Sequence, residues 1–208
     1  MNSLRLFPLE IGRLLHSRLT WLVVLLTAIA PSAGLILYQP ASASTMLSTG
    51  LANPALAGGA AGGILFGLLA ILDLDRAKRS RVEMLLDAAV SPLTMAGVRL
   101  VSLTTAALLT LGITMLVWLP ISRYFIGAVF DGVDYVLAYL LFLGLALPLS
   151  ILAAASAYQF TRRADLSIVL FAAFAALSLT LWADDWQLCW LNPCVWALSD
   201  DFSNFRIF

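Results

Sequence analysis

The chain reads PALAGGAAGGILFGLLAILDLDRAKR from Pro54 to Arg79, and this stretch decides the class of fold. Its first nineteen residues contain no Asp, Glu, Lys or Arg, whereas its last seven contain five charged side chains. A helix of about 20 apolar residues crosses a hydrocarbon core of about 30 Å. Because backbone groups in lipid must be satisfied internally, the stretch predicts a transmembrane helix over 54–72 that leads into a charged segment.

Four further charge-free runs flank this stretch, at residues 19–38, 100–119, 135–158 and 166–182. Hydrophobic residues make up 62% of the 208 residues and charged residues 12%, whereas a soluble domain has about 45–50% apolar and about 25% charged residues. This composition argues against a soluble enzyme, a disordered chain and a nucleic-acid binder. We predict an all-α polytopic membrane protein, a single transmembrane domain over 1–208 with five transmembrane helices.

The basic residues are distributed unevenly between the two sides of these spans. Ten of the twelve Lys and Arg residues lie in the N-terminal segment, in residues 73–99 or in residues 159–165. Since Lys and Arg accumulate on the cytoplasmic side, we predict a cytoplasmic N-terminus and an external tail over 183–208, either re-entrant or interfacial. Five spans leave the end at Phe208 outside, so we also expect a sixth span to be missing.

Residues 3–17 have the pattern of an amphipathic helix. The apolar side chains at helical spacing are Leu4, Phe7, Ile11, Leu14 and Leu15, and the other side carries Arg5, Glu10, Arg13 and Ser17. Such a pattern predicts an N-terminal helix lying at the membrane interface. The alternative is a generic cytoplasmic lead into the first span.

Glycines recur along one part of the second span. The small residues at four-residue spacing are the pairs Gly58/Gly62, Gly59/Gly63 and Gly63/Gly67. Such faces let helix backbones approach closely in lipid. They predict helix packing within the chain, with a subunit contact or a substrate-lining face as alternatives.

The segment 73–99 is charged but not uniformly polar. Its residues Val82, Leu85, Leu86 and Ala89 are spaced for one face of a short helix, which Ser91-Pro92 then interrupts. We predict a helical knob on the cytoplasmic side. The alternative is a basic loop held by anionic lipid.

Several kinds of catalytic site are missing from the sequence. The one histidine, His16, cannot form a histidine-based zinc site, and the one lysine, Lys78, does not follow a glycine as a nucleotide-binding loop requires. The predicted spans contain no ionisable residue, which argues against a proton pump or an ion-coupled carrier. We therefore expect no catalytic residue and no metal site. Cys189 and Cys194 in the external tail form either a disulfide or two free thiols.

Residues 81–100, RVEMLLDAAVSPLTMAGVRL, resemble the segment between the second and third spans of type-2 ABC exporter permeases. In that family a short helix is followed by a break and then by a glycine-lysine entry into span three. The residues that match the helix are Glu83, Leu85 and Leu86, and those that match the break are Val90, Ser91 and Pro92. Gly97 and Arg99 match the glycine-lysine entry. The layout is also similar, with an amphipathic helix before span one. The sequence departs from the family in the spacing of Gly97 and Arg99 and in the missing sixth span.

The resemblance implies a permease subunit in a bacterial plasma (inner) membrane that moves an amphiphilic cargo. This subunit is not itself an enzyme and holds no cofactor, because separate cytoplasmic ABC ATPase subunits bind ATP and magnesium. A second permease copy or paralogue completes a homo- or heterodimer. The implied coupling helix contacts the ATPase through Arg76, Arg79, Arg81, Glu83, Leu85, Leu86 and Asp87. The alternatives are a membrane scaffold or assembly subunit and, less favoured, a membrane-embedded lipid-modifying enzyme.

Overall fold

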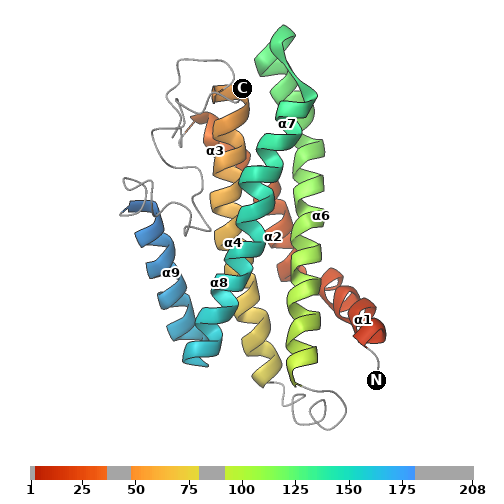
Figure 1. The fold of residues 1–208 in the computed structure, drawn as a ribbon, viewed down its shortest axis with the longest axis vertical. Coiled ribbons are helices and arrows are strands. Elements are labelled where there is room, and N and C mark those ends of the chain that lie inside the picture. The colour runs from red at the N-terminus through yellow and green to blue at the C-terminus, as the bar shows by residue number, and fades with distance from the viewer. Residues whose placement is uncertain (1–2, 37–47, 80–91, 181–208) are drawn as a thin grey trace.

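The structure is a computed structural model that describes residues 3–36, 48–79 and 92–180 (Figure 1). All regular secondary structure within these three ranges is helical. The elements are α1 (Ser3–Leu15), α2 (Arg18–Ile29), α3 (Pro31–Ile36), η1 (Ser48–Ala52), α4 (Asn53–Arg79), α6 (Pro92–Ile126), η2 (Gly127–Val129), α7 (Gly132–Tyr139), η3 (Leu140–Gly144), α8 (Leu145–Thr161) and α9 (Ala164–Thr180).

Four helical runs in the described part of the chain are long and apolar enough to cross a membrane. They are Arg18–Ile36, Gly50–Arg76, Thr94–Val129 and Gly132–Thr161, and they coincide with the first four predicted spans. The fifth predicted span, 166–182, begins on α9, where the apolar helix Ala164–Ala176 is shorter. The chain is therefore an all-helical protein with four membrane-compatible helices among its described residues.

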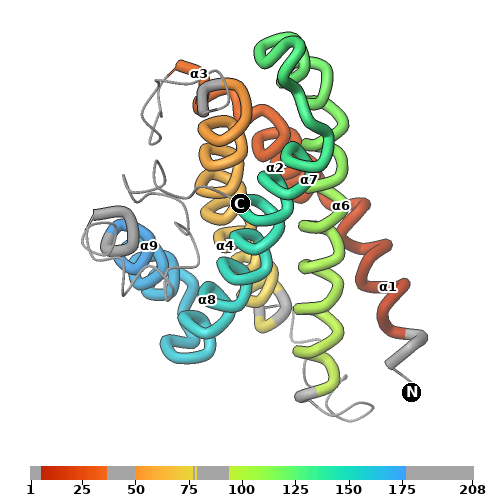
Figure 2. The backbone as a smooth tube through the Cα atoms, turned by 45° about the horizontal axis from the view of Figure 1, so that its top comes forward, coloured from red at the N-terminus to blue at the C-terminus, as the bar shows by residue number. Residues whose placement is uncertain are grey.

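Helix α4 lies at the centre of the bundle. It packs against α2, α3, α8 and α9, and Figures 1 and 2 both show it surrounded by these helices. Its apolar window is 67% buried, whereas the windows of the other three long helices are 28–33% buried. Since most residues in the windows of the other three helices are not buried, the outer faces of these helices are the ones that lipid would cover.

The glycines of α4 allow this central position. A Cβ atom at Gly59 would lie 2.6 Å from the carbonyl oxygen of Phe142, which is a backbone atom that cannot easily move. The other four glycines also meet neighbours within the chain: Gly58 meets Pro31 and Leu143, Gly62 meets Thr27 and Leu147, Gly63 meets Ser150, and Gly67 meets the ring of Phe171. The glycine face is thus occupied by helices of the same chain.

Prolines explain two irregularities in the long helices. The first span is divided at Ala30, between α2 and α3, because Pro31 has no N–H to continue the hydrogen-bond ladder. The second irregularity is the π-helical turn η3, which ends at Gly144. This residue lies four positions before Pro148, where the proline ring would clash with the carbonyl group of a regular helix.

Two helices extend well beyond their predicted spans. α4 continues past residue 72 to Arg79, and α6 begins at Pro92 and runs to Ile126. The charged ends of both helices are therefore helical, and they project from the same end of the bundle (Figure 1). Pro92 is well suited to the first helical position because its missing N–H needs no partner there.

Candidate functional site

Arg13 and Asp73 form a paired contact between α1 and α4. Arg13 Nη1 donates to Asp73 Oδ1 at 2.6 Å, and Arg13 Nη2 donates to Asp73 Oδ2 at 2.8 Å. The Asp73 side chain is 6% exposed and the Arg13 side chain 41% exposed. This two-pronged geometry fixes both side chains and is among the strongest hydrogen-bonding arrangements in proteins.

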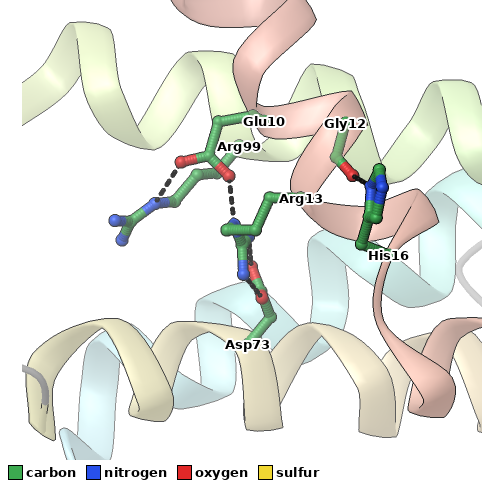
Figure 3. Close-up of polar contacts among 6 residues, drawn as sticks. All are labelled: Glu10, Gly12, Arg13, His16, Asp73 and Arg99. Atoms are coloured by element: carbon green, nitrogen blue, oxygen red, sulfur yellow. Dashed lines mark hydrogen bonds and ion pairs between the residues drawn. The ribbon is translucent and has the colours of Figure 1, made fainter.

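Glu10 extends the contact to α6. Its Oε2 atom accepts from Arg13 Nε at 2.6 Å, and its Oε1 atom lies 3.7 Å from Arg99 Nε. Figure 3 shows the four side chains pointing toward one another from three helices. We call Glu10, Arg13, Asp73 and Arg99 the charged cluster. The two positive and two negative charges of the cluster cancel, so the ionic contact among α1, α4 and α6 has no net charge.

The electrostatics of the cluster favour its charged form. The pKa of Arg13 is raised above its ordinary value, chiefly by the hydrogen bond to Asp73, while burial acts in the opposite direction and Glu10 adds a smaller contribution. Arg13 therefore stays protonated throughout the accessible pH range. Removing one partner of a mostly buried pair leaves an uncompensated charge, so the cluster is expected to hold α1 firmly in place.

The charged cluster changes the interpretation of the N-terminal helix. The sequence predicted an interfacial helix over residues 3–17 without saying what its polar side contacts, and in the structure Glu10 is buried on this helix together with Leu6 and Leu14. Leu9 and Leu15 are exposed instead. The physical reason is that Asp73 and Arg99 supply opposite charges to the polar side, so this side packs inward.

Asp73 also qualifies the expectation that the spans carry no ionisable residue. It lies within the apolar run Gly50–Arg76, one position beyond the predicted end of that span. The signal that could have found the cluster is the presence of Asp73 and Arg99 just outside two apolar runs. Nothing in the sequence pairs them with Glu10 and Arg13, which lie on another helix.

A second set of polar contacts joins α4 to the end of α8 and to the turn that follows it. Lys78 Nζ donates to the carbonyl oxygen of Arg162 at 2.9 Å, and the Tyr158 hydroxyl donates to Asp75 Oδ1 at 3.4 Å. Arg162 caps α8 in the left-handed conformation with φ of 52°. The charged end of α4 thus contacts helices on two sides. His16 takes no part, because its Nδ1 atom lies 2.8 Å from the Gly12 carbonyl oxygen of its own helix (Figure 3).

The structure describes only part of the predicted coupling segment. Arg76 is exposed on α4, and Arg79 is the last residue of that helix. The other predicted coupling residues, Arg81, Glu83, Leu85, Leu86 and Asp87, lie outside the described residues. The same is true of Cys189, Cys194 and the rest of the predicted tail 183–208.

No group of three or more His, Cys, Asp or Glu residues that could hold a metal ion occurs within 3–36, 48–79 and 92–180. Comparison of the chain with protein-family models, with curated proteins and with solved structures finds no match.

Proposed function

We propose that the chain is the transmembrane permease subunit of an ABC exporter. Separate cytoplasmic ATPase subunits energise the transport of an amphiphilic cargo. The proposal is supported by the resemblance of residues 81–100 and by the layout of an amphipathic helix followed by long apolar helices. The N-terminus and residues 80–91 face the cytoplasm, as the positions of the basic residues favour. A second permease subunit pairs with this one.

The observation that carries the proposal is the position of the charged cluster. Residues 80–91 join the end of α4 at Arg79 to the start of α6 at Pro92. Asp73 and Arg99 lie close to those two helix ends, and both are tied to α1 through Glu10 and Arg13. A force applied to residues 80–91 therefore acts on helices that are already connected to one another.

This connection suits the transmission of a conformational change. An ATPase can drive the permease between two states only if its contacts differ between those states. The Leu85-Leu86 pair supplies an apolar anchor, and Arg76, Arg81, Glu83 and Asp87 supply polar contacts. Closure of the ATPase would then displace α4 and α6 together with α1, rather than bend a single helix end.

The proposal is tested by measuring ATP hydrolysis of the complex of permease and ATPase reconstituted in membranes. Leu85→Asp and Glu83→Lys should each lower permease-stimulated ATP hydrolysis at least tenfold while the chain still inserts. The control is Val129→Asp, which introduces a carboxylate at an exposed residue near the opposite end of α6. It should leave hydrolysis within twofold of the wild-type rate. Unchanged hydrolysis in both coupling variants would remove residues 80–91 from the coupling role.

A further inference from the structure

Helix α6 is longer than a hydrocarbon core requires. Its 35 residues extend over about 50 Å at 1.5 Å per residue, whereas the core is about 30 Å thick. In a membrane crossed by α6, Arg99 of the charged cluster marks one boundary of the core, because a charge inside hydrocarbon is costly. The other boundary then lies about 30 Å further along the helix, close to Leu119. The last turns of α6, from Pro120 to Ile126, therefore lie beyond the core.

The exposed side chains of α6 change in kind at the same level. From Val101 to Leu119 they are all aliphatic. Beyond this point Arg123, Tyr124 and Phe125 are exposed, and Tyr124 is 85% exposed. The two rings contact each other edge to face, with their centroids 6.0 Å apart. Aliphatic side chains suit hydrocarbon, whereas Tyr and Arg are typical of the headgroup layer, so composition and helix length indicate the same boundary.

The other exposed aromatic side chains of the described residues lie at the opposite boundary. Trp21 is close to the start of α2 and donates its indole N–H to the Leu15 carbonyl oxygen of α1 at 2.7 Å. Phe160 is exposed near the end of α8, two positions before Arg162, whose carbonyl oxygen accepts from Lys78 at the charged end of α4. The exposed rings in the described part of the chain therefore lie at two levels, and aliphatic surface lies between them.

The turn between α6 and α7 presents Tyr124 and Phe125 on a fixed scaffold. This turn projects past the start of α4 (Figure 1). The Tyr135 hydroxyl on α7 donates to the Met115 carbonyl oxygen on α6 at 2.6 Å, and the Tyr135 ring packs against Phe130 in the turn. The two helices are thus joined on both sides of the turn, so the rings are held at a defined height.

The turn itself is amphipathic. Asp131 and Asp134 are exposed on either side of Val133, and a carboxylate is costly inside hydrocarbon. Val129 and Val133 are also exposed, and apolar surface of this kind is unfavourable in water. The layer of lipid headgroups between hydrocarbon and water accommodates both kinds of side chain.

We propose that residues 120–133 bind the headgroup layer of the leaflet opposite the charged cluster. The Tyr124 and Phe125 rings lie at the level of the lipid ester groups, and the Arg123 guanidinium group contacts lipid phosphates. The partner is a phospholipid surface rather than a single bound lipid. The interaction goes beyond the proposed permease function and does not depend on it, because it follows from the length of α6 and from its exposed side chains.

The depth of these residues is measured on the full chain reconstituted in dioleoylphosphatidylcholine vesicles. Cys189→Ser and Cys194→Ser remove the native thiols, and a nitroxide label is attached to one introduced cysteine at Leu109, Leu116, Tyr124 or Phe125, so that one ring always remains. Collisions of the label with oxygen and with a water-soluble nickel chelate give its depth. We expect the Leu109 label near the bilayer centre and the Tyr124 label close to the phosphates, about 20 Å away along the membrane normal.

Three results would overturn the proposal. A Tyr124 label as deep as the Leu116 label would show that tilting draws the turn into the hydrocarbon core. A Tyr124 label as accessible to the nickel chelate as a free label in water would put the turn outside the membrane. A label that neither oxygen nor nickel reaches would assign this surface to another protein, such as a second copy of the chain.

The contribution of the side chains is tested with the label at Val129, which leaves both rings in place. Tyr124→Ser combined with Phe125→Ser should raise the collisions of this label with the nickel chelate at least twofold. Tyr124→Trp combined with Phe125→Trp is the matched control and should leave them unchanged. Arg123→Glu should also raise the collisions, whereas Arg123→Lys should not. Because these side chains are exposed, the variants keep the internal packing. Unchanged collisions in the double serine variant would contradict the proposal.

Discussion

Arg13 on α1 donates two parallel hydrogen bonds, of 2.6 and 2.8 Å, to the carboxylate of Asp73 on α4, sixty positions further along the sequence. Glu10, one helical turn before Arg13, connects the same helix to Arg99 on α6. The N-terminal helix is therefore attached to two long helices by charge as well as by apolar packing. This attachment joins α1 to α4, which ends just before residues 80–91 in the sequence, and to α6, which begins just after them.

The two partners of the central pair should respond unequally to substitution. Arg13→Met leaves the mostly buried Asp73 carboxylate without a cation and should destabilise the protein by about 3 kcal/mol. Asp73→Leu leaves Arg13 with Glu10 and partial access to solvent, so we expect a smaller loss of about 1 kcal/mol. Thermal unfolding of the purified chain in detergent checks both values.

The double variant provides the control for this pair. Because an apolar pair of similar volume often replaces a buried ion pair without loss, Arg13→Met with Asp73→Leu should recover most of the stability lost by Arg13→Met alone. Strictly additive losses would show that the two side chains act independently of each other.

The contact of Gly59 with the π-helical turn η3 predicts a steric effect. A methyl group at this position would lie 2.6 Å from the Phe142 carbonyl oxygen, so Gly59→Ala should cost about 1–3 kcal/mol. Gly112 on α6 is the matched control, because a Cβ atom there meets nothing within 4 Å. Gly112→Ala should be neutral or stabilising by up to about 1 kcal/mol. Equal melting temperatures for the two variants would contradict the close approach of the helices.

Arg162 offers a stabilising substitution. It has a φ of 52°, a conformation that costs a side-chain-bearing residue about 1 kcal/mol and glycine little. Arg162→Gly keeps the backbone hydrogen bonds to Tyr158 and from Lys78, so we expect the melting temperature to rise. Arg162→Val should lower it. A fall in both variants would indicate that the guanidinium group itself is needed.

Trp118 connects α6 to the end of α2. It is 5% exposed, and its indole N–H donates to the Ala28 carbonyl oxygen at 2.8 Å. Trp118→Phe should therefore lose about 1 kcal/mol, because the donor disappears and part of the ring volume is left empty. Tyr124→Phe on the same helix, at an exposed side chain, should have no measurable effect in the same unfolding assay.

The sequence predicted the long helices well, because absence of charge over about 20 residues is a local property. The runs 19–38, 54–72, 100–119 and 135–158 each fall on a membrane-compatible helix. Their ends were less predictable. Charged residues such as Asp73 and Arg76 were predicted to lie beyond the end of the span, yet they continue α4, because Asp73 binds Arg13 and Arg76 is exposed.

The charged cluster was not predicted, for a different reason. Helical spacing assigns Glu10 and Arg13 to one side of α1 but does not say what that side contacts. The answer depends on how α1 crosses α4 and α6, which is a tertiary property of the pairs Arg13–Asp73 and Glu10–Arg99, 60 and 89 positions apart. Arg99 was likewise matched only to the glycine-lysine entry into span three, and nothing in the sequence pairs it with Glu10.

The most direct test of the permease assignment is to identify the proteins that co-purify with the tagged chain from its native membrane in mild detergent. We predict a stoichiometric ATPase that carries a nucleotide-binding loop, retained by the Val129→Asp variant and lost by Leu85→Asp. Folded, membrane-inserted chain that brings down no ATPase, or an ATPase that Leu85→Asp retains in full, would contradict the assignment.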